Sequence, residues 1–268
     1  MSSEIALVTA AGAREWDEDL APLERALGSL GVAAEIVVWD DPAVAWKRYD
    51  LVVVRSTWDY VPQRDKFLTW ADRVSGLTRL ANPAEILRWN TDKRYLRDLS
   101  SQGISIVPTH WIAPDEEATL PYAGEFVVKP AISAGAKDTV RYEAGDHPRA
   151  LAQIRQLQSA GRTVMVQPYM RTIDSSGESA LIYLGGEYSH SIRKGAMLRS
   201  QQSLVHGLYV QEEISACSAT EEERRVADQI LRLLPVKKGS LLYARVDLVP
   251  GEDGSPMLLE LELTEPSL

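Results

Sequence analysis

Hydrophobic positions in the first eighty residues form short apolar runs that alternate with amphipathic segments. Three runs, Ile5–Thr9, Ala34–Trp39 and Leu51–Arg55, are rich in Val, Ile and Leu and have the length of buried strands. Between the first two runs, Asp19–Leu30 spaces its leucines as a helix does, and Gly31 is a typical helix stop. Strands that alternate with helices predict a parallel sheet, so we expect a Rossmann-like α/β domain here. The segment has no G-x-G-x-x-G and no Walker A lysine, so we expect no nucleotide bound in the Rossmann manner.

The pattern changes after this domain. Asn82-Pro83 opens a helical stretch that runs through Leu99, a strand is expected at Ile106–Ile112, and Ala113–Gly124 is an acidic linker with prolines. A larger α+β domain follows, which ends in a second hairpin. Its expected elements before that hairpin are Phe126–Lys129, Thr139–Tyr142, a helix at Ala150–Ser159, Val164–Pro168, the hairpin Ser179–Leu184 with Tyr188–Arg193, and a helix at Thr220–Leu233.

Composition and charge exclude several classes of protein. The 29 Lys and Arg against 38 Asp and Glu give a net charge of −9, which is unfavourable for binding nucleic acid. Hydrophobic residues make up 45% and charged residues 25% of the chain, so extended disorder is excluded. The single cysteine, Cys217, excludes an intrachain disulfide and a cysteine-based zinc cluster. Because Ile5–Ala11 is too short to span a membrane and has no basic flank, we expect a cytoplasmic protein without membrane contacts.

The last two apolar segments alternate as the strands of a hairpin do, around the turn Pro250–Pro256. In the first strand one face carries Tyr243, Arg245 and Asp247. In the second strand alternation predicts a face that carries Leu258, Glu260, Glu262 and Thr264. The opposite face of that strand is expected to carry Met257, Leu259, Leu261 and Leu263.

If the two polar faces meet, three carboxylates converge beside Arg245. Carboxylates at such short distances repel one another, and a hard divalent cation relieves the repulsion. Mg²⁺ suits the site because it takes few protein carboxylates and completes its shell with nucleotide phosphates. The sequence therefore predicts a magnesium site at Asp247, Glu260 and Glu262. The alternative is a half-solvated hairpin whose polar face meets only water.

Two segments are candidates for binding a nucleotide. Lys129 ends an apolar strand before a loop of small residues that contains Ser133, Ala134 and Gly135, and an ammonium with backbone N–H groups can surround a phosphate. The alternative is an ordinary Lys-Pro strand end with a flexible loop. Gln167–Met170 interrupts a strand at a proline and can offer backbone groups to an adenine edge, although a buried strand end explains it equally well.

Two charged residues near the first hairpin also have alternative interpretations. Glu178 can hold a ribose hydroxyl or cap the hairpin. Lys194, next to Arg193, can stabilise an acyl phosphate or form a surface ion pair.

In chain order these segments resemble the ATP-grasp superfamily, in its glutathione-synthetase-like branch. The resemblance covers about residues 80–268 and begins with Lys93, which is expected on a helix. Glu260–Ser267 is similar to the family's Glu-x-Asn-x-Thr-x-Pro strand, with Glu262 where Asn is usual. The chain ends at Leu268, where relatives usually continue, so we expect a covering C-terminal segment to be missing.

Three further segments resemble the D-cycloserine synthetase group: Val54–Tyr60, Leu87–Leu96 and Ser189–Gly195. The members of this group are ATP-dependent cyclo-ligases of antibiotic biosynthesis that act on O-ureido-D-serine. The resemblance implies a carbon–nitrogen ligase that activates an amino-acid carboxylate as an acyl phosphate and closes a ring, converting ATP to ADP and phosphate. It also implies Mg²⁺ as cofactor and a small amino acid as substrate.

The resemblance implies a role for each candidate residue. Lys93 and Lys129 would hold the nucleotide phosphates, under a loop formed by Ser133, Ala134 and Gly135. Adenine would be received by Gln167, Pro168, Tyr169 and Met170, and the ribose by Glu178. Mg²⁺ would be bound by Asp247, Glu260 and Glu262. Arg245 and Lys194 would be the catalytic residues that stabilise the acyl phosphate and the oxyanion.

The turn Ser56–Tyr60 is the candidate for the amino-acid pocket. It follows the third strand of the expected parallel sheet, and ligands of open α/β sheets gather outside the carboxyl ends of the strands. The candidate substrate-binding residues are Arg55, Ser56, Thr57 and Trp58, with Arg55 as partner of a carboxylate. The alternative is that Trp58 and Tyr60 only cap the domain.

Together these inferences predict four parts: an N-terminal α/β domain (1–80), a central linker region (81–124), a lid subdomain (125–190) and a C-terminal catalytic subdomain with the metal site (191–268). Two other functions stay open. One is an intermolecular ligase that joins two amino acids, and the other is a nucleotide-binding module without catalysis. A homo-oligomer is compatible with the sequence.

Overall fold

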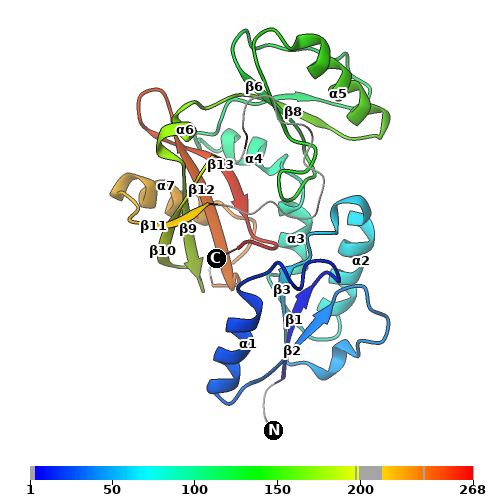
Figure 1. Cartoon of the computed structure of the whole chain (residues 1–268). Helices are drawn as coiled ribbons and strands as arrows, with labels where there is room; N and C mark the ends of the chain where they lie inside the picture. Colours follow the sequence, from blue (N-terminus) through cyan, green and yellow to red (C-terminus); the bar gives the residue numbers. More distant parts are fainter. Residues whose placement is uncertain (1–3, 197, 199–212, 238, 268) are drawn as a thin grey trace.

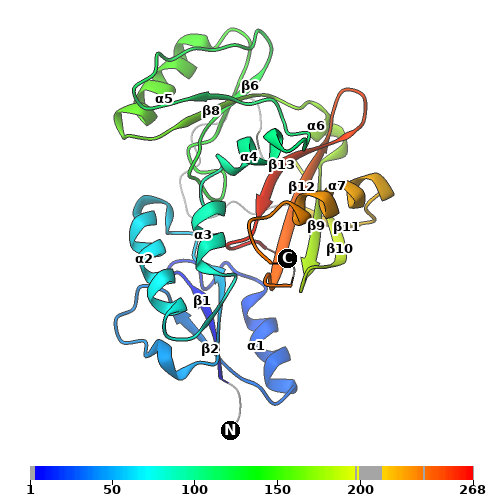
Figure 2. The ribbon, with the colours of Figure 1, turned by 180° about the vertical axis from the view of Figure 1, so that it is seen from behind.

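The computed structural model describes residues 4–196, 198, 213–237 and 239–267. Three sheets organise this part of the chain. The N-terminal sheet and a small antiparallel sheet lie at opposite ends of the molecule, and a five-stranded sheet lies between them (Figure 1). The same arrangement is seen from behind in Figure 2. No helix in these ranges combines the length and the apolar character needed to cross a bilayer.

The N-terminal sheet is parallel, with strand order β2–β1–β3–β4. Its strands are β1 (Glu4–Thr9), β2 (Ala33–Val38), β3 (Leu51–Ser56) and β4 (Arg79–Ala81). Its helices are α1 (Leu20–Ser29), α2 (Arg64–Ser75) and the single 3-10 turns Trp46–Arg48 and Val61–Gln63. The core on one side is aromatic: Trp39, Phe67 and Trp70 are buried with ring centroids 5.4 to 6.1 Å apart. The three predicted strands and the first helix are confirmed, whereas α2 and β4 were not predicted.

The second sheet is antiparallel, with order β5–β8–β6–β7, and helix α5 packs on it. Its elements are β5 (His110–Ile112), β6 (Phe126–Pro130), β7 (Val140–Tyr142), α5 (His147–Ser159) and β8 (Val164–Pro168). The prediction of a strand at Ile106–Ile112 was too long. Within it only β5 pairs as a strand, and Ile106 makes an isolated bridge to Leu258 in the central sheet.

The central sheet is antiparallel, with order β11–β10–β9–β12–β13. Its elements are α6 (Thr172–Ser176), β9 (Glu178–Leu184), β10 (Glu187–Lys194), β11 (Ile214–Cys217), α7 (Glu221–Arg232), β12 (Tyr243–Pro250) and β13 (Pro256–Glu262). Thr220 begins α7 with a capping box, because its side chain accepts from the Glu223 N–H while Glu223 accepts from the Thr220 N–H. Both predicted hairpins and this helix are confirmed.

The expected boundary between the lid and catalytic subdomains, at residue 190, lies within the central sheet. Position 190 falls inside β10, and β9 pairs with β12 along Tyr243–Leu248. The buried run Ala180–Tyr183 explains the difference, because it packs into the core of the central sheet. The second sheet therefore ends with β8, before residue 170.

The helical stretch after Asn82 is interrupted, which the sequence did not predict. Helices α3 (Ala84–Asn90) and α4 (Tyr95–Ser101) are separated by a turn that contains Lys93, so this lysine does not lie on a helix. The Asp92 carboxylate accepts from the backbone and side chain of Arg94, and the Lys93 N–H donates to the Ala131 carbonyl. These bonds take the backbone out of the helix and direct it toward β6.

Strand β13 contains a bulge that changes which side chains share a face. Asp247 pairs with Glu260, but the next residue, Leu248, pairs with Leu258, so Leu259 is the extra residue. Leu258 consequently packs into the core of the central sheet, whereas Leu259 lines a cavity together with Glu260. The predicted alternation was therefore wrong for residues 257–259, because a period of two does not continue through a bulge.

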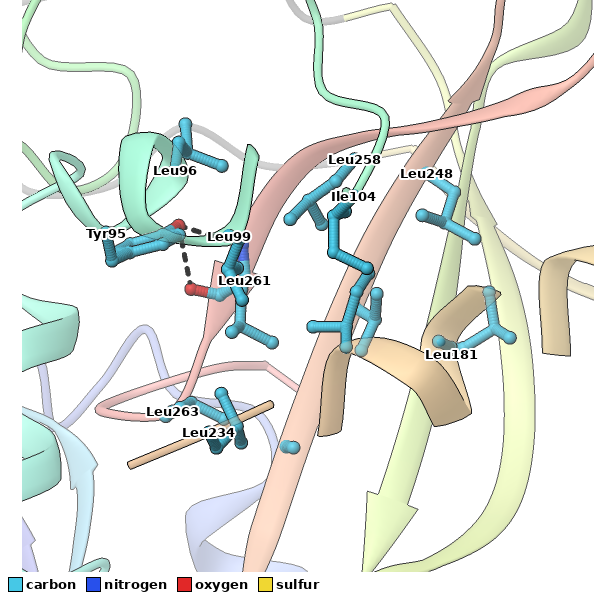
Figure 3. Packing of buried hydrophobic residues seen from close by; sticks show 14 of the residues in the cluster. Tyr95, Leu96, Leu99, Ile104, Leu181, Leu234, Leu248, Leu258, Leu261 and Leu263 are labelled. Atoms are coloured by element: carbon cyan, nitrogen blue, oxygen red, sulfur yellow. Dashed lines mark hydrogen bonds between the residues drawn. The ribbon is translucent and has the colours of Figure 1, made fainter. Parts of the chain in front are cut away.

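The segment 82–95 is attached to β12 and β13 by buried polar side chains. The Asn82 amide bonds to the backbone of Leu242, Tyr243 and Leu263. The Asn90 amide donates to the Leu261 carbonyl and accepts from the Leu263 N–H. The Tyr95 hydroxyl accepts from the Leu261 N–H at 2.9 Å and donates to its carbonyl at 3.0 Å (Figure 3). These bonds continue the backbone pairing of the central sheet beyond its edge.

Tyr95→Phe tests this attachment. The substitution removes only the hydroxyl group and leaves the buried N–H of Leu261 without that hydrogen-bond partner. We expect the free energy of unfolding to fall by about 1–3 kcal/mol in urea denaturation. Tyr122→Phe is the matched control, since its hydroxyl donates to the Pro108 carbonyl at the surface, and its loss should cost less than about 0.5 kcal/mol. Equal effects of the two substitutions would contradict a special contribution of Tyr95.

Candidate active site

One cavity is lined by residues of the second sheet, of the central sheet and of the turn that follows β3 in the N-terminal domain. Trp58 and Tyr60 come from the N-terminal domain, Lys129 from the second sheet, and Arg245 and Glu260 from the central hairpin. The cavity therefore lies where the N-terminal domain, the second sheet and the central sheet meet. The polar face of the β12–β13 hairpin lines it. Arg245 and Asp247 are each only 2% exposed, so this face is not the half-solvated surface considered above.

Lys93 is a buried cation at one side of the cavity. Its ammonium lies 2.8 Å from the Glu260 carboxylate and donates to the Ser133 carbonyl, also at 2.8 Å. Burial alone would lower the pKa of Lys93, but the charge and hydrogen bond of Glu260, together with the charges of Glu262 and Glu265, outweigh burial, and the pKa is raised. Lys93 therefore stays charged and connects the loop after β6 to the central hairpin.

Lys129 lies at the end of β6 and is only 8% exposed. Burial lowers its pKa, the neighbouring charge of Lys93 lowers it further, and Glu260 and Glu178 oppose these effects. Two buried ammonium groups beside each other are favourable only with additional negative charge. The oxygens of a polyphosphate would supply that charge.

The β12–β13 hairpin holds a network of charges around Asp247. Arg245 donates from Nε to Oδ1 at 2.9 Å and from Nη2 to Oδ2 at 3.0 Å. Nη2 also donates to Glu262 at 2.5 Å. The Lys194 ammonium lies 3.1 Å from Asp247 and 3.5 Å from Glu178. Burial would raise the pKa of Asp247, but Arg245 and Lys194 outweigh it and hold the pKa below its usual range.

Gly177 permits Glu178 to reach this network. Its φ of +67° is a left-handed conformation that favours glycine, and a Cβ there would lie 2.5 Å from the Lys194 carbonyl oxygen. The close approach of β9 to β10 at this point places the Glu178 carboxylate against the Lys194 ammonium. Glu178 thus begins a strand whose first residue points into the cavity.

The carboxylates at the far end of the hairpin carry an excess of negative charge. Burial raises the pKa of Glu262 to about 7, and the charges of Asp247 and Glu260 add to this effect against Arg245. Burial and the charge of Glu262 raise the pKa of Glu265 to about 8. In contrast, Lys93 and Lys129 overcome the effect of burial on Glu260 and lower its pKa.

The wall formed by Gln167–Met170 is fixed from outside the cavity. The guanidinium of Arg141 stacks 3.4 Å from the centre of the Tyr169 ring, and the Tyr169 hydroxyl donates to Asp174 at 2.6 Å. Arg141 in turn pairs with Glu125 at 2.9 Å. Tyr169 is therefore held by charged neighbours, and the segment lines the cavity at the end of β8.

Taken together, the cavity brings two lysines at its β6 side, Arg245 and Lys194 at its hairpin side, and five carboxylates into one space. Such a site can bind a polyanion, orient a reacting carboxylate and stabilise negative charge that develops in a transition state.

The chain is similar to known proteins in both sequence and structure. The family of D-cycloserine synthetase DcsG N-terminal domains matches residues 5–82. The cycloserine biosynthesis protein DcsG of Streptomyces lavendulae is 40% identical, over 98% of this chain and 92% of its own.

The chain belongs to the D-cycloserine synthetase DcsG family. The crystal structure of D-cycloserine synthetase DcsG superposes with a TM-score of 0.87 and 39% identity, and the match covers 99% of this chain and 93% of that one. D-alanine–D-alanine ligase from Bacillus anthracis, in complex with ATP, has a TM-score of 0.66 and 14% identity, over 98% and 87% of the two chains. That second likeness shows the fold alone, which is the fold of ATP-grasp ligases. The predicted family and the predicted α/β and α+β fold class are confirmed.

In the present structure most of the predicted site residues line one cavity. Those that line it are Trp58, Lys93, Lys129, Ser133, Ala134, Gly135, Gln167, Pro168, Tyr169, Met170, Glu178, Lys194, Arg245, Asp247, Glu260 and Glu262. Their individual roles stay predictions. Arg55, Ser56 and Thr57 do not line the cavity. Arg55 is 3% exposed and pairs with Asp19 at 3.2 Å, outside the cavity.

Several lining residues were not among the predicted site residues, namely Tyr60, Asn90, Glu265 and Ser267. Tyr60 and Glu265 were visible in the sequence, since both stand within motifs of the family resemblance. Their proximity was not, because it joins the first domain to the last strand over two hundred residues.

Two carboxylates of the β12–β13 hairpin, Glu260 and Glu262, suit the coordination of Mg²⁺. Glu260 and Glu262 each pair with a cation through one oxygen, and the raised pKa of Glu262 indicates an excess of negative charge that a divalent ion would relieve. Asp247 is occupied by Arg245 and Lys194. Within the described ranges no three His, Cys, Asp or Glu side chains converge as a complete metal cluster. Glu260 and Glu262 thus fit an ion that takes its other ligands from phosphate and water.

Lys129→Ala tests the phosphate side of the cavity. The ammonium lies beside Lys93, and its charge is expected to attract phosphate. Its removal should therefore weaken the binding of ATP by about 10-fold or more and that of adenosine by less than about 2-fold. Isothermal titration calorimetry with both ligands measures the difference. Lys47→Ala, at an exposed position of the N-terminal domain, is the control. Equal weakening of ATP and adenosine would indicate a structural role for Lys129.

The pKa values of Glu262 and Glu265 predict how stability depends on pH. The folded protein keeps protons on these groups at a pH where the unfolded chain has lost them. Their stabilising contribution is therefore complete below about pH 4.5 and is lost as the pH rises through about 7 and about 8. We expect the free energy of unfolding without ligands to fall between about pH 5 and about pH 8.5. Glu265→Gln should make the fall shallower in urea titrations, whereas the exposed Glu187→Gln should leave the slope unchanged.

Proposed function

We propose that this protein is an ATP- and Mg²⁺-dependent cyclo-ligase that converts O-ureido-D-serine to D-cycloserine. The observation that carries the proposal is the cavity itself: Lys93, Lys129, Lys194 and Arg245 face one space at the junction of the three sheets. Membership of the D-cycloserine synthetase DcsG family supports the substrate. The ATP-grasp fold supports the use of ATP.

The nucleotide binds along the side of the cavity formed by the second sheet. Gln167–Met170 receives adenine, with Tyr169 held in place by Arg141, and Glu178 binds the ribose. Lys93 and Lys129 bind the phosphates under the loop of Ser133–Gly135. Because the two ammonium groups already repel each other, phosphate binding relieves an unfavourable interaction of the ligand-free site.

The substrate carboxylate is placed at Arg245, at the opposite side of the triphosphate. Its oxygen attacks the γ-phosphorus, the bond to the β-phosphate oxygen breaks, and ADP leaves. Lys194 and Arg245 stabilise the resulting acyl phosphate. Glu260 and Glu262 would hold Mg²⁺, which would supply positive charge against the phosphate oxygens.

Ring closure follows within the same molecule. The N–H nitrogen next to the substrate's chain oxygen attacks the acyl carbon, and Arg245 stabilises the oxyanion of the tetrahedral intermediate. Phosphate then leaves, and the nitrogen loses its proton. Water hydrolyses the carbamoyl group, which leaves as CO₂ and ammonia. An intramolecular nucleophile needs no second amino-acid site, since its effective molarity reaches about 10⁵–10⁸ M when it is well oriented.

Incubation with O-ureido-D-serine, ATP and Mg²⁺ tests the reaction directly. We expect D-cycloserine, ADP and phosphate in equal amounts without any second amine, identified by mass spectrometry and phosphate release. An intermolecular ligase would release phosphate only after a second amino acid is added and would yield an amide. That result would replace the cyclo-ligase. Absence of ATP turnover under all these conditions would instead favour a nucleotide-binding module.

Glu260→Gln and Arg245→Met separate the two sides of the reaction. Glu260→Gln keeps the shape of the side chain but removes the charge that pairs with Lys93, so ATP turnover should fall by about 10²-fold or more even at saturating Mg²⁺. Arg245→Met should lower kcat by about 10²–10³-fold with a smaller effect on ATP affinity, because its contact strengthens as the oxyanion forms. Glu252→Gln, in the exposed hairpin turn, is the control for both. Near-normal turnover of Glu260→Gln would refute the metal assignment.

A further inference from the structure

The carboxylates that line the cavity differ in one respect. Glu178 and Asp247 lie within 4.0 Å of Lys194, Glu260 pairs with Lys93, and Glu262 pairs with Arg245. Glu265 also lines the cavity, but among the residues that the structure describes no lysine, arginine or histidine nitrogen lies within 4.0 Å of its carboxylate. One cavity carboxylate therefore has no cation from the described protein.

Glu265 is nevertheless held in a defined position. The Trp58 indole N–H donates to its backbone carbonyl at 3.2 Å, and the Tyr60 hydroxyl, which lines the same cavity, lies close enough to the carboxylate to lower the pKa of Glu265. The Tyr60 ring is itself fixed, since it stacks on Phe67 with a centroid distance of 5.0 Å and an interplanar angle of 25°. The turn of the N-terminal domain thus orients this carboxylate from two sides.

A carboxylate in such surroundings is stabilised by an incoming cation. Burial together with the charge of Glu262 raises the pKa of Glu265 to about 8, although the charge of Lys93 and the Tyr60 hydroxyl oppose these effects, so the ionised form is only partly compensated in the ligand-free protein. A ligand that brings its own ammonium group would supply this compensation. Its binding would also satisfy a buried polar group that the protein leaves to the ligand.

The position of Glu265 fits the chemistry of an α-amino acid. Arg245, where the substrate carboxylate is placed, donates to Glu262 at 2.5 Å and to the Ser267 carbonyl at 3.0 Å, on either side of Glu265 in the sequence. In an α-amino acid a single carbon separates the ammonium from the carboxylate. A substrate whose carboxylate meets Arg245 therefore presents its ammonium to the same short stretch of chain.

We propose that Glu265, oriented by Tyr60, binds the α-ammonium group of the amino-acid substrate. Glu265 is then a substrate-binding residue and Tyr60 a positioning residue. The inference rests on the proposed function in that the substrate is an α-amino acid whose carboxylate lies at Arg245, so it holds equally for a cyclo-ligase and for an intermolecular ligase.

The test compares two substrates in two proteins. One substrate is O-ureido-D-serine, and the other is its analogue with hydrogen in place of the α-ammonium. The wild-type protein should prefer the amino acid by about 10- to 100-fold in kcat/KM, the range of one charge-assisted hydrogen bond. Glu265→Gln should lose most of that preference through a higher KM for the amino acid, while its affinity for Mg²⁺ADP changes less than 2-fold.

Two further variants complete the experiment. Tyr60→Phe keeps the carboxylate but removes the hydroxyl that orients it, so the preference should fall to a value between those of the wild type and Glu265→Gln. Glu187→Gln, at an exposed position of β10, should keep the wild-type preference. Unchanged Mg²⁺ADP affinity shows that each variant is folded, and Tyr60→Phe alone decides the question if Glu265→Gln is not.

A Glu265→Gln protein that keeps the wild-type preference for the ammonium would overturn the proposal. So would a variant whose only defect is a higher requirement for Mg²⁺, because the carboxylate would then serve the metal. A wild-type protein that does not turn over O-ureido-D-serine would contradict the proposed function instead. The comparison is then made with the amino acid that does support phosphate release, and the same loss of preference is expected.

Discussion

The buried ion pair between Arg245 and Asp247 is the interaction on which the rest of the site depends. Both residues lie on β12, an internal strand of the central sheet between β9 and β13. Asp247 also pairs with Lys194, and Arg245 also donates to Glu262 and to the Ser267 carbonyl. Removing one member of such a pair leaves a buried charge uncompensated, at a cost of about 3–5 kcal/mol. The central sheet is thus arranged around a charge network that must be complete.

The network also explains why the cavity needs residues from several segments. The cavity face of the β12–β13 hairpin carries three carboxylates, Asp247, Glu260 and Glu262, but one cation, Arg245, and Lys93 and Lys194 come from other segments. The turn after α3 and the strand β10 therefore converge on the hairpin. Lys129 then remains with insufficient negative charge, and Glu265 with insufficient positive charge. The phosphates of ATP and the ammonium of an amino acid would match these two deficits.

Most elements with a strong local signal could be predicted from the sequence. Buried strands rich in Val and Ile, the leucine spacing of α1 and the Gly-Gly turn before β10 each depend on neighbouring residues. What failed depends on distant ones. The break at Lys93 results from its N–H bonding to Ala131, and the bulge at Leu259 exists only in the pairing with β12. The chemistry of the hairpin was predictable from its charged residues, whereas Tyr60 beside Glu265 follows from the packing of the first domain against the last strand.

The amides of Asn82 and Asn90 and the hydroxyl of Tyr95 find their partners about 160 to 180 positions later in the chain. A ribosome makes the chain from its N-terminus, so these polar groups are synthesised long before residues 242–264 exist to receive them. The early α/β domain can collapse on its own aromatic core, but its junction with the remainder cannot close until the last hairpin has emerged. The active site therefore cannot assemble before residues 242–264 have been made, and a chain that stops short of them has no complete cavity.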